Sequence, residues 1–220
     1  MPSASGTLRA ARRSREREIV AATRVLFDER GLQDAPIEEI ARAVGINKAL
    51  IYRHFASKDE LYVATVSLYL DELAERLHGV DPELDHVGRL REGWGRYADF
   101  CLEYPAFLDC ALSLMRRPAS DLRERVPDAI WLRLGQAMSA CIGPLAAILA
   151  AGAADGVLDV DDPDFVANRL YAQTLGTMHL ARVGAGVLGA ADGLPGTFAI
   201  DARRVRDACV ADALAAVGVR

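Results

Sequence analysis

The feature that most limits how this chain can fold is a pair of short helical segments separated by Gly45. The first segment, 36–44, places its apolar residues on one helical face: Ile37, Ile40, Ala41 and Val44. Glycine tolerates the left-handed backbone that a tight turn after a helix needs. Asn47, a favoured N-cap, then begins a second short helix over 48–55. We therefore expect two short helices joined by a tight turn.

The remainder of the chain also has helical character. Glycine, proline and capping residues delimit the segments, and Ser57 with Glu60 forms a capping-box pattern at one helix start. No segment alternates apolar and polar residues convincingly as a strand does, so we predict an all-α fold. A glycine-rich stretch, 184–196, separates the last two helices. The predicted helices span 13–30, 36–44, 48–55, 57–77, 84–103, 105–117, 121–154 with breaks near Pro127 and Pro144, 162–183 and 201–217.

Composition is that of a soluble globular protein, with 220 residues of which 26% are charged. No stretch approaches the roughly 18 uncharged apolar residues that span a bilayer, and 137–154 is typical of a buried helix. No apolar leader follows Met1. We therefore expect a cytoplasmic protein without a membrane partner.

The four cysteines are widely spaced and form no Cys-x-x-Cys pair: Cys101, Cys110, Cys141 and Cys209. This spacing argues against a zinc site and against a disulfide framework. We interpret them as small buried apolar residues, with a redox-sensing thiol as the alternative. No metal or cofactor is expected.

Charge is divided unevenly along the chain. Residues 1–58 carry a net charge of +4, whereas 59–220 carry −9. A basic segment on an acidic body is expected if only that segment faces phosphate. Residues 1–12 are predicted to form a disordered basic arm. Its arginines either contact phosphates or the minor groove, or simply solvate the tail.

The second helix of the pair has an inner and an outer face. Ile51 and Phe55 are four residues apart and point inward, so the outer positions are free to meet a ligand. In a helix-turn-helix this helix enters the DNA major groove, where cations reach guanine or phosphate and hydroxyl groups bind phosphate. Leu50 is more typical of packing; the alternative for Tyr52 is a half-buried aromatic with a solvated hydroxyl, and for His54 a solvated surface histidine. The predicted DNA-binding residues are Lys48, Ala49, Leu50, Tyr52, Arg53, His54 and Lys58.

The segment resembles the DNA-binding domain of TetR-type repressors. The matching elements are Phe27 to Gly31, Ile40-Ala41 to Gly45-Ile46, Asn47-Lys48-Ala49, Tyr52 to Phe55, and Ser57-Lys58 to Leu61. Ala35-Pro36 departs from the threonine common there, which removes a hydroxyl cap and phosphate contact. The resemblance implies a dimer with an operator-binding domain at 13–60 and an effector-binding and dimerisation domain at 61–220. It also implies a regulator that usually represses and that a small molecule releases.

The C-terminal body offers aromatic and soft side chains for an apolar pocket, although core packing is the default role for each. His179 is interpreted as a core residue more readily than as a ligand contact. A hydrophobic effector is favoured. The candidate effector-pocket residues are Trp94, Tyr97, Phe100, Phe107, Met115, Trp131, Met138, Tyr171 and His179.

The last two helices are expected to form a four-helix bundle across a two-fold axis. Packing within one chain is the alternative. A dimer would present its recognition helices to major grooves roughly 34–36 Å apart, which predicts a palindromic operator. The candidate interface residues are Phe165, Ala172, Gly176, Leu180, Val205, Ala208 and Leu214.

Together these patterns predict a ligand-responsive, DNA-binding homodimer, in preference to two other classes. An enzyme is disfavoured because the candidate acid–base groups, His86 with Asp85 or the acids of 155–164, show no nucleophile–base or metal-ligand spacing. A helical dimer that acts through protein partners, with a degenerate DNA-binding domain, is the alternative. Lys48, Tyr52 and Lys58 argue against such degeneracy.

Overall fold

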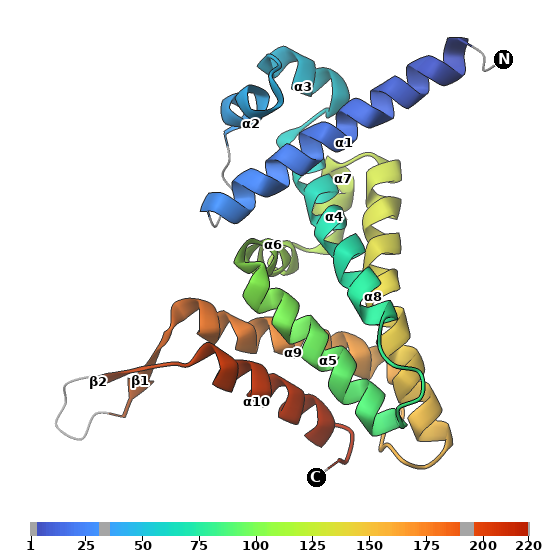
Figure 1. The fold of residues 1–220 in the computed structure, drawn as a ribbon, viewed down its shortest axis with the longest axis vertical. Coiled ribbons are helices and arrows are strands. Elements are labelled where there is room, and N and C mark those ends of the chain that lie inside the picture. The colour runs from blue at the N-terminus through green and yellow to red at the C-terminus, as the bar shows by residue number, and fades with distance from the viewer. Residues whose placement is uncertain (1–3, 31–35, 190–195, 220) are drawn as a thin grey trace. The chain divides into compact units, whose positions relative to one another are not determined.

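The computed structural model describes residues 4–30, 36–189 and 196–219. The chain divides into two compact units, one made of 1–69 with 109–137 and the other of 70–108 with 138–220. Expectations for residues 1–3, Gly31, Ala35 and 190–195 lie outside the described residues. Figure 1 labels the elements along the chain.

The described residues form ten α-helices and one β-hairpin, which confirms the predicted all-α class. Most helix ends lie within two residues of the predicted positions. The helices are α1 (Ala4–Arg30), α2 (Ile37–Val44), α3 (Lys48–His54), α4 (Lys58–His78), α5 (His86–Glu103), α6 (Pro105–Met115), α7 (Ala119–Arg125), α8 (Asp128–Ala154), α9 (Pro163–Val183) and α10 (Ala202–Ala215).

The first helix corrects the expected disorder of the arm, since α1 already begins at Ala4. Ion pairs spaced for a helix support this segment: Arg12 Nε lies 2.8 Å from Glu16 and Arg15 lies 2.7 Å from Glu18. Alanine, arginine and glutamate also have high helix propensity. Residues 4–12 therefore continue the helix that we expected to begin at 13.

Helix α8 shows that one of the two expected breaks is real. Pro127 separates α7 from α8, but Pro144 lies inside α8 without ending it. A mid-helix proline costs about 3 kcal/mol or more. Burial of Leu145, Ile148 and Leu149 offsets this cost, because each contributes about 1.5–3 kcal/mol.

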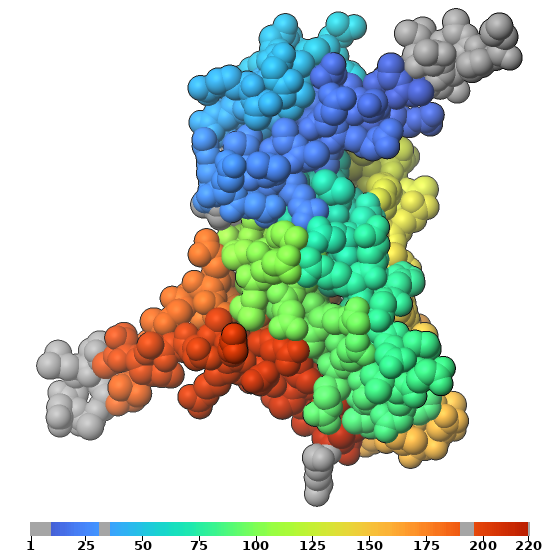
Figure 2. All heavy atoms as spheres, in the orientation of Figure 1, coloured from blue at the N-terminus to red at the C-terminus, as the bar shows by residue number. Residues whose placement is uncertain are grey.

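The hairpin was not predicted. Strands β1 (Ala185–Leu188) and β2 (Gly196–Ala199) pair antiparallel, with Ala185 opposite Ala199 and Leu188 opposite Gly196. Six of the eight strand residues are exposed, and the other two, Gly186 and Gly196, are half-buried. The sequence therefore lacks the alternation that marks a half-buried strand. Figure 2 shows the hairpin standing out from the adjoining helices.

In the first unit, α1 packs on α2 and α3. Ile19, Ile40, Ile51 and Phe55 are buried between these helices. The Tyr69 hydroxyl lies 2.6 Å from a carboxylate oxygen of Asp28. This core holds the outer face of α3 in a defined orientation.

In the second unit, α5, α9 and α10 pack side by side (Figure 1). Trp94 is fully buried, and its Nε1 donates to Oγ1 of Thr174 over 2.9 Å. Arg206 of α10 makes a bidentate pair with Asp99 of α5 at 3.0 and 3.1 Å. These contacts fix the register of α5 against α9 and α10.

Candidate nucleic-acid interface

Helix α2 ends at the turn that the sequence predicted. Gly45 adopts φ 72°, and its N–H donates to the carbonyl oxygens of Ala41 and Arg42. The N–H of Ile46 also donates to the Ala41 oxygen, at 2.9 Å. Pro36 occupies the N-cap of α2 and not the expected first helical position, so the helix begins one residue later, at Ile37.

Helix α3 is capped and anchored as expected. The side-chain oxygen of Asn47 accepts from the N–H of Leu50 over 2.8 Å. Ile51 and Phe55 are buried against the core, so the predicted inner face is confirmed. Cap and anchors together set which residues of α3 face outward.

The predicted DNA-binding residues divide into an exposed group and a partly covered group. Lys48, Ala49, Tyr52 and Arg53 are exposed, Tyr52 by 43%. Lys58 is also exposed, in the first turn of α4, whereas Leu50 is half-buried. The exposed group defines what we call the α3 outer face: Lys48, Ala49, Tyr52 and Arg53.

His54 lies differently from the other members of the set. Its side chain is 13% exposed, and Nδ1 lies 3.5 Å from a carboxylate oxygen of Glu16 on α1. Among the described residues, Nδ1 has no hydrogen-bond partner. His54 thus faces α1, where it helps hold α3 against that helix.

An ion pair crosses from α2 to the α3 outer face. The Nζ of Lys48 lies 2.6 Å from a carboxylate oxygen of Glu38. The hydrogen bond to Lys48 lowers the pKa of Glu38, and the same bond raises the pKa of Lys48. Both groups are exposed to solvent, so Lys48 can exchange this carboxylate for a phosphate. Sequence reasoning missed Glu38, because it is ten positions away on another helix.

The second unit brings together three of the nine candidate pocket residues. Trp94, Tyr97 and Tyr171 line a cavity about as large as one water molecule. Six further lining residues were missed, because aliphatic core side chains carry no distinguishing sequence signal: Leu73, Leu77, Cys141, Ile142, Leu145 and Ala167. Burial raises the pKa of Tyr97 well above its ordinary value.

The other six candidates lie elsewhere. Phe100 and Phe107 are fully buried and meet edge to face, with ring centroids 5.1 Å apart. Met115 is 47% exposed. Trp131 and Met138 are partly exposed, and His179 is exposed rather than buried in a core. None of the six lines the cavity.

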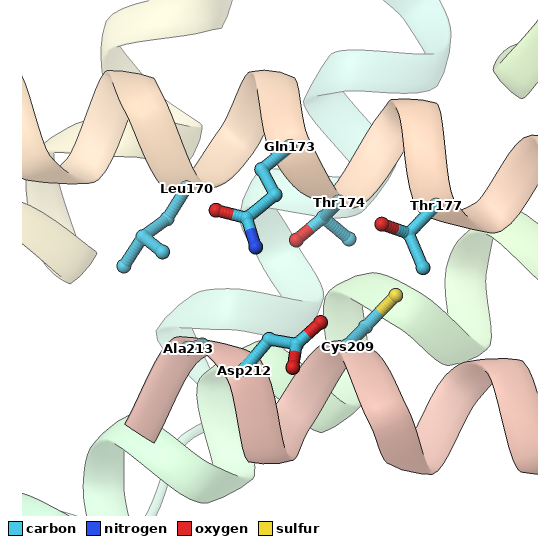
Figure 3. A pocket seen from close by; sticks show the side chains of 7 residues that line it. All are labelled: Leu170, Gln173, Thr174, Thr177, Cys209, Asp212 and Ala213. Atoms are coloured by element: carbon cyan, nitrogen blue, oxygen red, sulfur yellow. The ribbon is translucent and has the colours of Figure 1, made fainter. Parts of the chain in front are cut away.

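A separate narrow groove runs between α9 and α10 (Figure 3). Gln173, Thr174 and Thr177 of α9 face Cys209 and Asp212 of α10 across it. The side chains leave no room for a water molecule. The groove is therefore a seam of helix packing.

The candidate interface residues differ between the last two helices. On α9, Phe165 is 63% exposed, and Gly176 and Leu180 are also exposed. On α10, Ala208 is exposed, whereas Val205 and Leu214 are buried within the chain. Ala172 is half-buried. Val205 and Leu214 pack inward, because α10 turns that side toward α5 and α9.

The four cysteines are buried, as interpreted from the sequence. Burial raises the pKa of Cys110 and Cys141 to about 12 and that of Cys209 to about 11. At neutral pH these thiols are protonated and unreactive. Within the described ranges, no cluster of three or more His, Cys, Asp or Glu could hold a metal ion.

Among the described helices, α8 is long and apolar enough by composition to cross a membrane, with 39% of its most apolar window buried. The core helix of a soluble protein passes the same test. Its buried residues recur at helical spacing: Leu134, Ala137, Cys141, Leu145 and Leu149. This pattern is typical of a core helix.

Comparison with known proteins shows that the part of the chain around α2 and α3 is similar to a family of bacterial regulators. Residues 19–65 match the model of bacterial regulatory proteins of the tetR family. The transcriptional regulator TcmR of Streptomyces glaucescens is 35% identical over 159 residues, which cover 69% of this chain and 64% of TcmR. The transcriptional activator FasR of Mycolicibacterium smegmatis is 32% identical over 90 residues, which cover 40% of this chain and 41% of FasR.

Solved structures share the fold over nearly the whole chain. The structure of RolR in complex with resorcinol has a TM-score of 0.65 at 18% identity, and covers 96% of this chain and 91% of RolR. At 18% identity, this similarity shows a shared fold and nothing more. In sequence, the match spans less than two thirds of TcmR and about two fifths of FasR.

Proposed function

We propose that this chain, which is similar to bacterial regulatory proteins of the tetR family over residues 19–65 and to TcmR over 159 residues, is a cytoplasmic transcription regulator, a homodimer that binds operator DNA and is released by a small apolar molecule. The observation that carries the proposal is the α3 outer face. Lys48, Tyr52 and Arg53 are exposed on a helix whose opposite face is anchored by Ile51 and Phe55. Such a helix can enter a major groove without losing its packing.

Each group on this face has a role that follows from its chemistry. Lys48 and Arg53 reach guanine acceptors or phosphates, and Ala49 permits close approach to the base edges. The Tyr52 hydroxyl bonds a phosphate oxygen. Lys58 adds its charge to the N-terminal amides of α4, which favour an anion. Leu50 and His54 act mainly through packing, since both are partly covered.

Dimerisation is proposed through the exposed sides of α9 and α10. Phe165, Leu180 and Val183 expose large apolar side chains along α9, which a monomer rarely leaves uncovered as a group. Gly176 has open space where a Cβ would stand, so a partner helix can approach closely. Ala208 and Ala211 supply small exposed side chains on α10. Paired by a two-fold axis, the four helices form a bundle.

Release is proposed as a two-state equilibrium in which the effector favours the conformation with lower operator affinity. RolR was solved with resorcinol, which is a small aromatic molecule. By analogy, we assign the effector of this chain to the cavity lined by Trp94, Tyr97 and Tyr171. Helix α4 supplies Leu73 and Leu77 to that cavity and carries Lys58 in its first turn. It is therefore a continuous element through which an effector could act on the DNA-binding residues.

The test is binding to the DNA upstream of the chain's own gene, measured at several salt concentrations. For DNA contacts, log K falls with log[salt] by about 0.9 per phosphate neutralised. Lys48→Ala should therefore reduce the slope by about one contact, whereas Tyr52→Ala should weaken binding with little change in slope. Arg91→Ala, which removes an exposed cation from α5, is the matched control and should change neither.

Two outcomes would count against the proposal. Salt-insensitive capture of a protein partner without DNA affinity would favour the partner-binding dimer with a degenerate DNA-binding domain. If selection from random DNA yields no palindromic sequence, binding of a two-fold symmetric dimer to a palindromic operator would be excluded. A reporter under the selected operator then separates repression, the direction proposed here, from activation.

A further inference from the structure

The cavity of the second unit is lined almost entirely by apolar atoms. Its nine lining residues come from α4, α5, α8 and α9, and none of them carries a charge. Burying a carboxylate or ammonium group without a partner costs far more free energy than its contacts in a cavity supply. This lining therefore selects against charged molecules.

One polar group in the wall lacks a partner. The hydroxyl of Tyr97 is buried, with the residue only 2% exposed, and has no hydrogen-bond partner within the described structure. The Cys101 thiol does interact with this hydroxyl, but thiols are weak hydrogen-bonding groups, and among the described residues no hydrogen bond of normal geometry satisfies the Tyr97 hydroxyl. A buried hydroxyl without a hydrogen-bond partner destabilises the fold. A ligand that hydrogen-bonds the Tyr97 hydroxyl would remove this destabilisation.

Two other polar atoms of the wall are already engaged. The Trp94 indole donates to Thr174, and the Cys141 thiol lies 3.1 Å from the carbonyl oxygen of Leu70, to which it donates. The Tyr97 hydroxyl thus remains a buried polar group of the wall without a hydrogen-bond partner in the part of the chain that the structure describes.

The rings of the wall favour a flat ligand. Tyr97 and Tyr171 are stacked, with centroids 5.7 Å apart and planes inclined by 17°. Trp94 supplies a third aromatic surface. Aromatic groups pack favourably against such surfaces in offset or edge-to-face arrangements. The present space holds about one water, so a ligand must displace lining side chains as it enters.

We propose that this cavity binds an uncharged, flat aromatic molecule with one small polar substituent, which hydrogen-bonds the Tyr97 hydroxyl. The simplest member of this class is a phenol. The inference rests on the proposed function, because it names the chemical class of the effector. It adds that Tyr97 determines specificity, whereas the stacked rings and aliphatic side chains supply the contact area.

The experiment uses three probes of matched size on the full-length chain: 4-methylphenol, toluene and 4-methylbenzoate. The chain has two tryptophans, Trp94 and Trp131, so Trp131→Phe leaves Trp94 as the fluorescent reporter in the cavity wall. In this background 4-methylphenol should bind about threefold to tenfold more tightly than toluene, the range of one net hydrogen bond. The charged 4-methylbenzoate should not bind.

Tyr97→Phe removes only the hydroxyl and keeps the ring. This variant should lose the preference for 4-methylphenol over toluene and should melt at a higher temperature without ligand, because no buried hydroxyl is left unmet. Tyr104→Phe is the matched control, since the Tyr104 hydroxyl bonds Glu72 at 2.9 Å and Tyr104 is not part of the cavity lining. It should leave the selectivity unchanged.

The proposal is overturned if 4-methylbenzoate binds as tightly as 4-methylphenol, if no probe binds, or if Tyr97→Phe keeps the preference. Operator affinity without probes is measured on the same samples. Loss of DNA binding would sink the proposed regulatory function and leave the fluorescence result standing. Intact DNA binding with no response of Trp94 would reject the ligand class alone.

Discussion

Replacing Gly45 with alanine isolates the cost of the turn between α2 and α3. Gly45 adopts φ 72°, and a Cβ added there would meet no atom within 4 Å. The cost of placing alanine at this position therefore comes from its backbone conformation and not from a clash with neighbouring atoms. The left-handed region costs an L-residue about 1–2 kcal/mol, of which the smaller unfolded-state entropy of alanine offsets about 0.4–1 kcal/mol. We expect a net loss of about 1 kcal/mol.

A second glycine gives the matched control with the opposite sign. Gly135 lies inside α8, and an added Cβ there also meets open space. Since alanine is favoured over glycine in a helix by about 0.8–1 kcal/mol, Gly135→Ala should stabilise the protein. The same chemical change thus separates the two variants by about 2 kcal/mol, or about 4–8 °C in Tm for a chain of this size.

Thermal and urea unfolding at one fixed protein concentration measure the difference. Gly45→Asn should fall between wild type and Gly45→Ala, because asparagine enters the left-handed region more readily. If Gly45→Ala were as stable as wild type, the left-handed turn would not be a requirement of this motif. Operator affinity of the folded Gly45→Ala protein then reports whether the crossing of α2 and α3 has changed.

Three further predictions concern a cap, a buried pair and the thiols. Asn47→Ala should lower the free energy of unfolding by about 1 kcal/mol in urea titrations, because it removes the cap of α3. Asn47→Ser should retain most of this stability, and an equal loss in the serine and alanine variants would reject the capping role. Thr174→Val should cost about 1–3 kcal/mol, since the Trp94 indole N–H is then buried without a partner, and an unchanged Tm would contradict this. Because burial raises the pKa of Cys110 and Cys141 to about 12, these thiols stay protonated in the folded chain but ionise in the unfolded chain above about pH 9. The stability that they contribute is complete below pH ~9 and falls as pH rises toward ~12; rapid thiol labelling of the native protein at pH 8 would oppose this assignment.

Local sequence was sufficient for most of the DNA-binding half. The cap at Asn47, the turn at Gly45 and the buried positions Ile51 and Phe55 were all predicted, because each depends on neighbours within four residues along one helix. The start of α1 was missed because alanine- and arginine-rich segments suit both a helix and a solvated tail. The hairpin after α9 was missed because its strands are exposed on both faces.

The sequence by itself determined most of the helices, the helix pair around Gly45 and the resemblance to TetR-type regulators, since these depend on local spacing and on a contiguous motif. Only the tertiary structure decided that Trp94, Tyr97 and Tyr171 share a cavity while Phe100 and Phe107 fill the core. It also decided that His54 faces Glu16 and that Val205 and Leu214 point inward. Helical periodicity says that a side chain lies on an apolar face, but which helix covers that face depends on contacts between segments distant in the sequence.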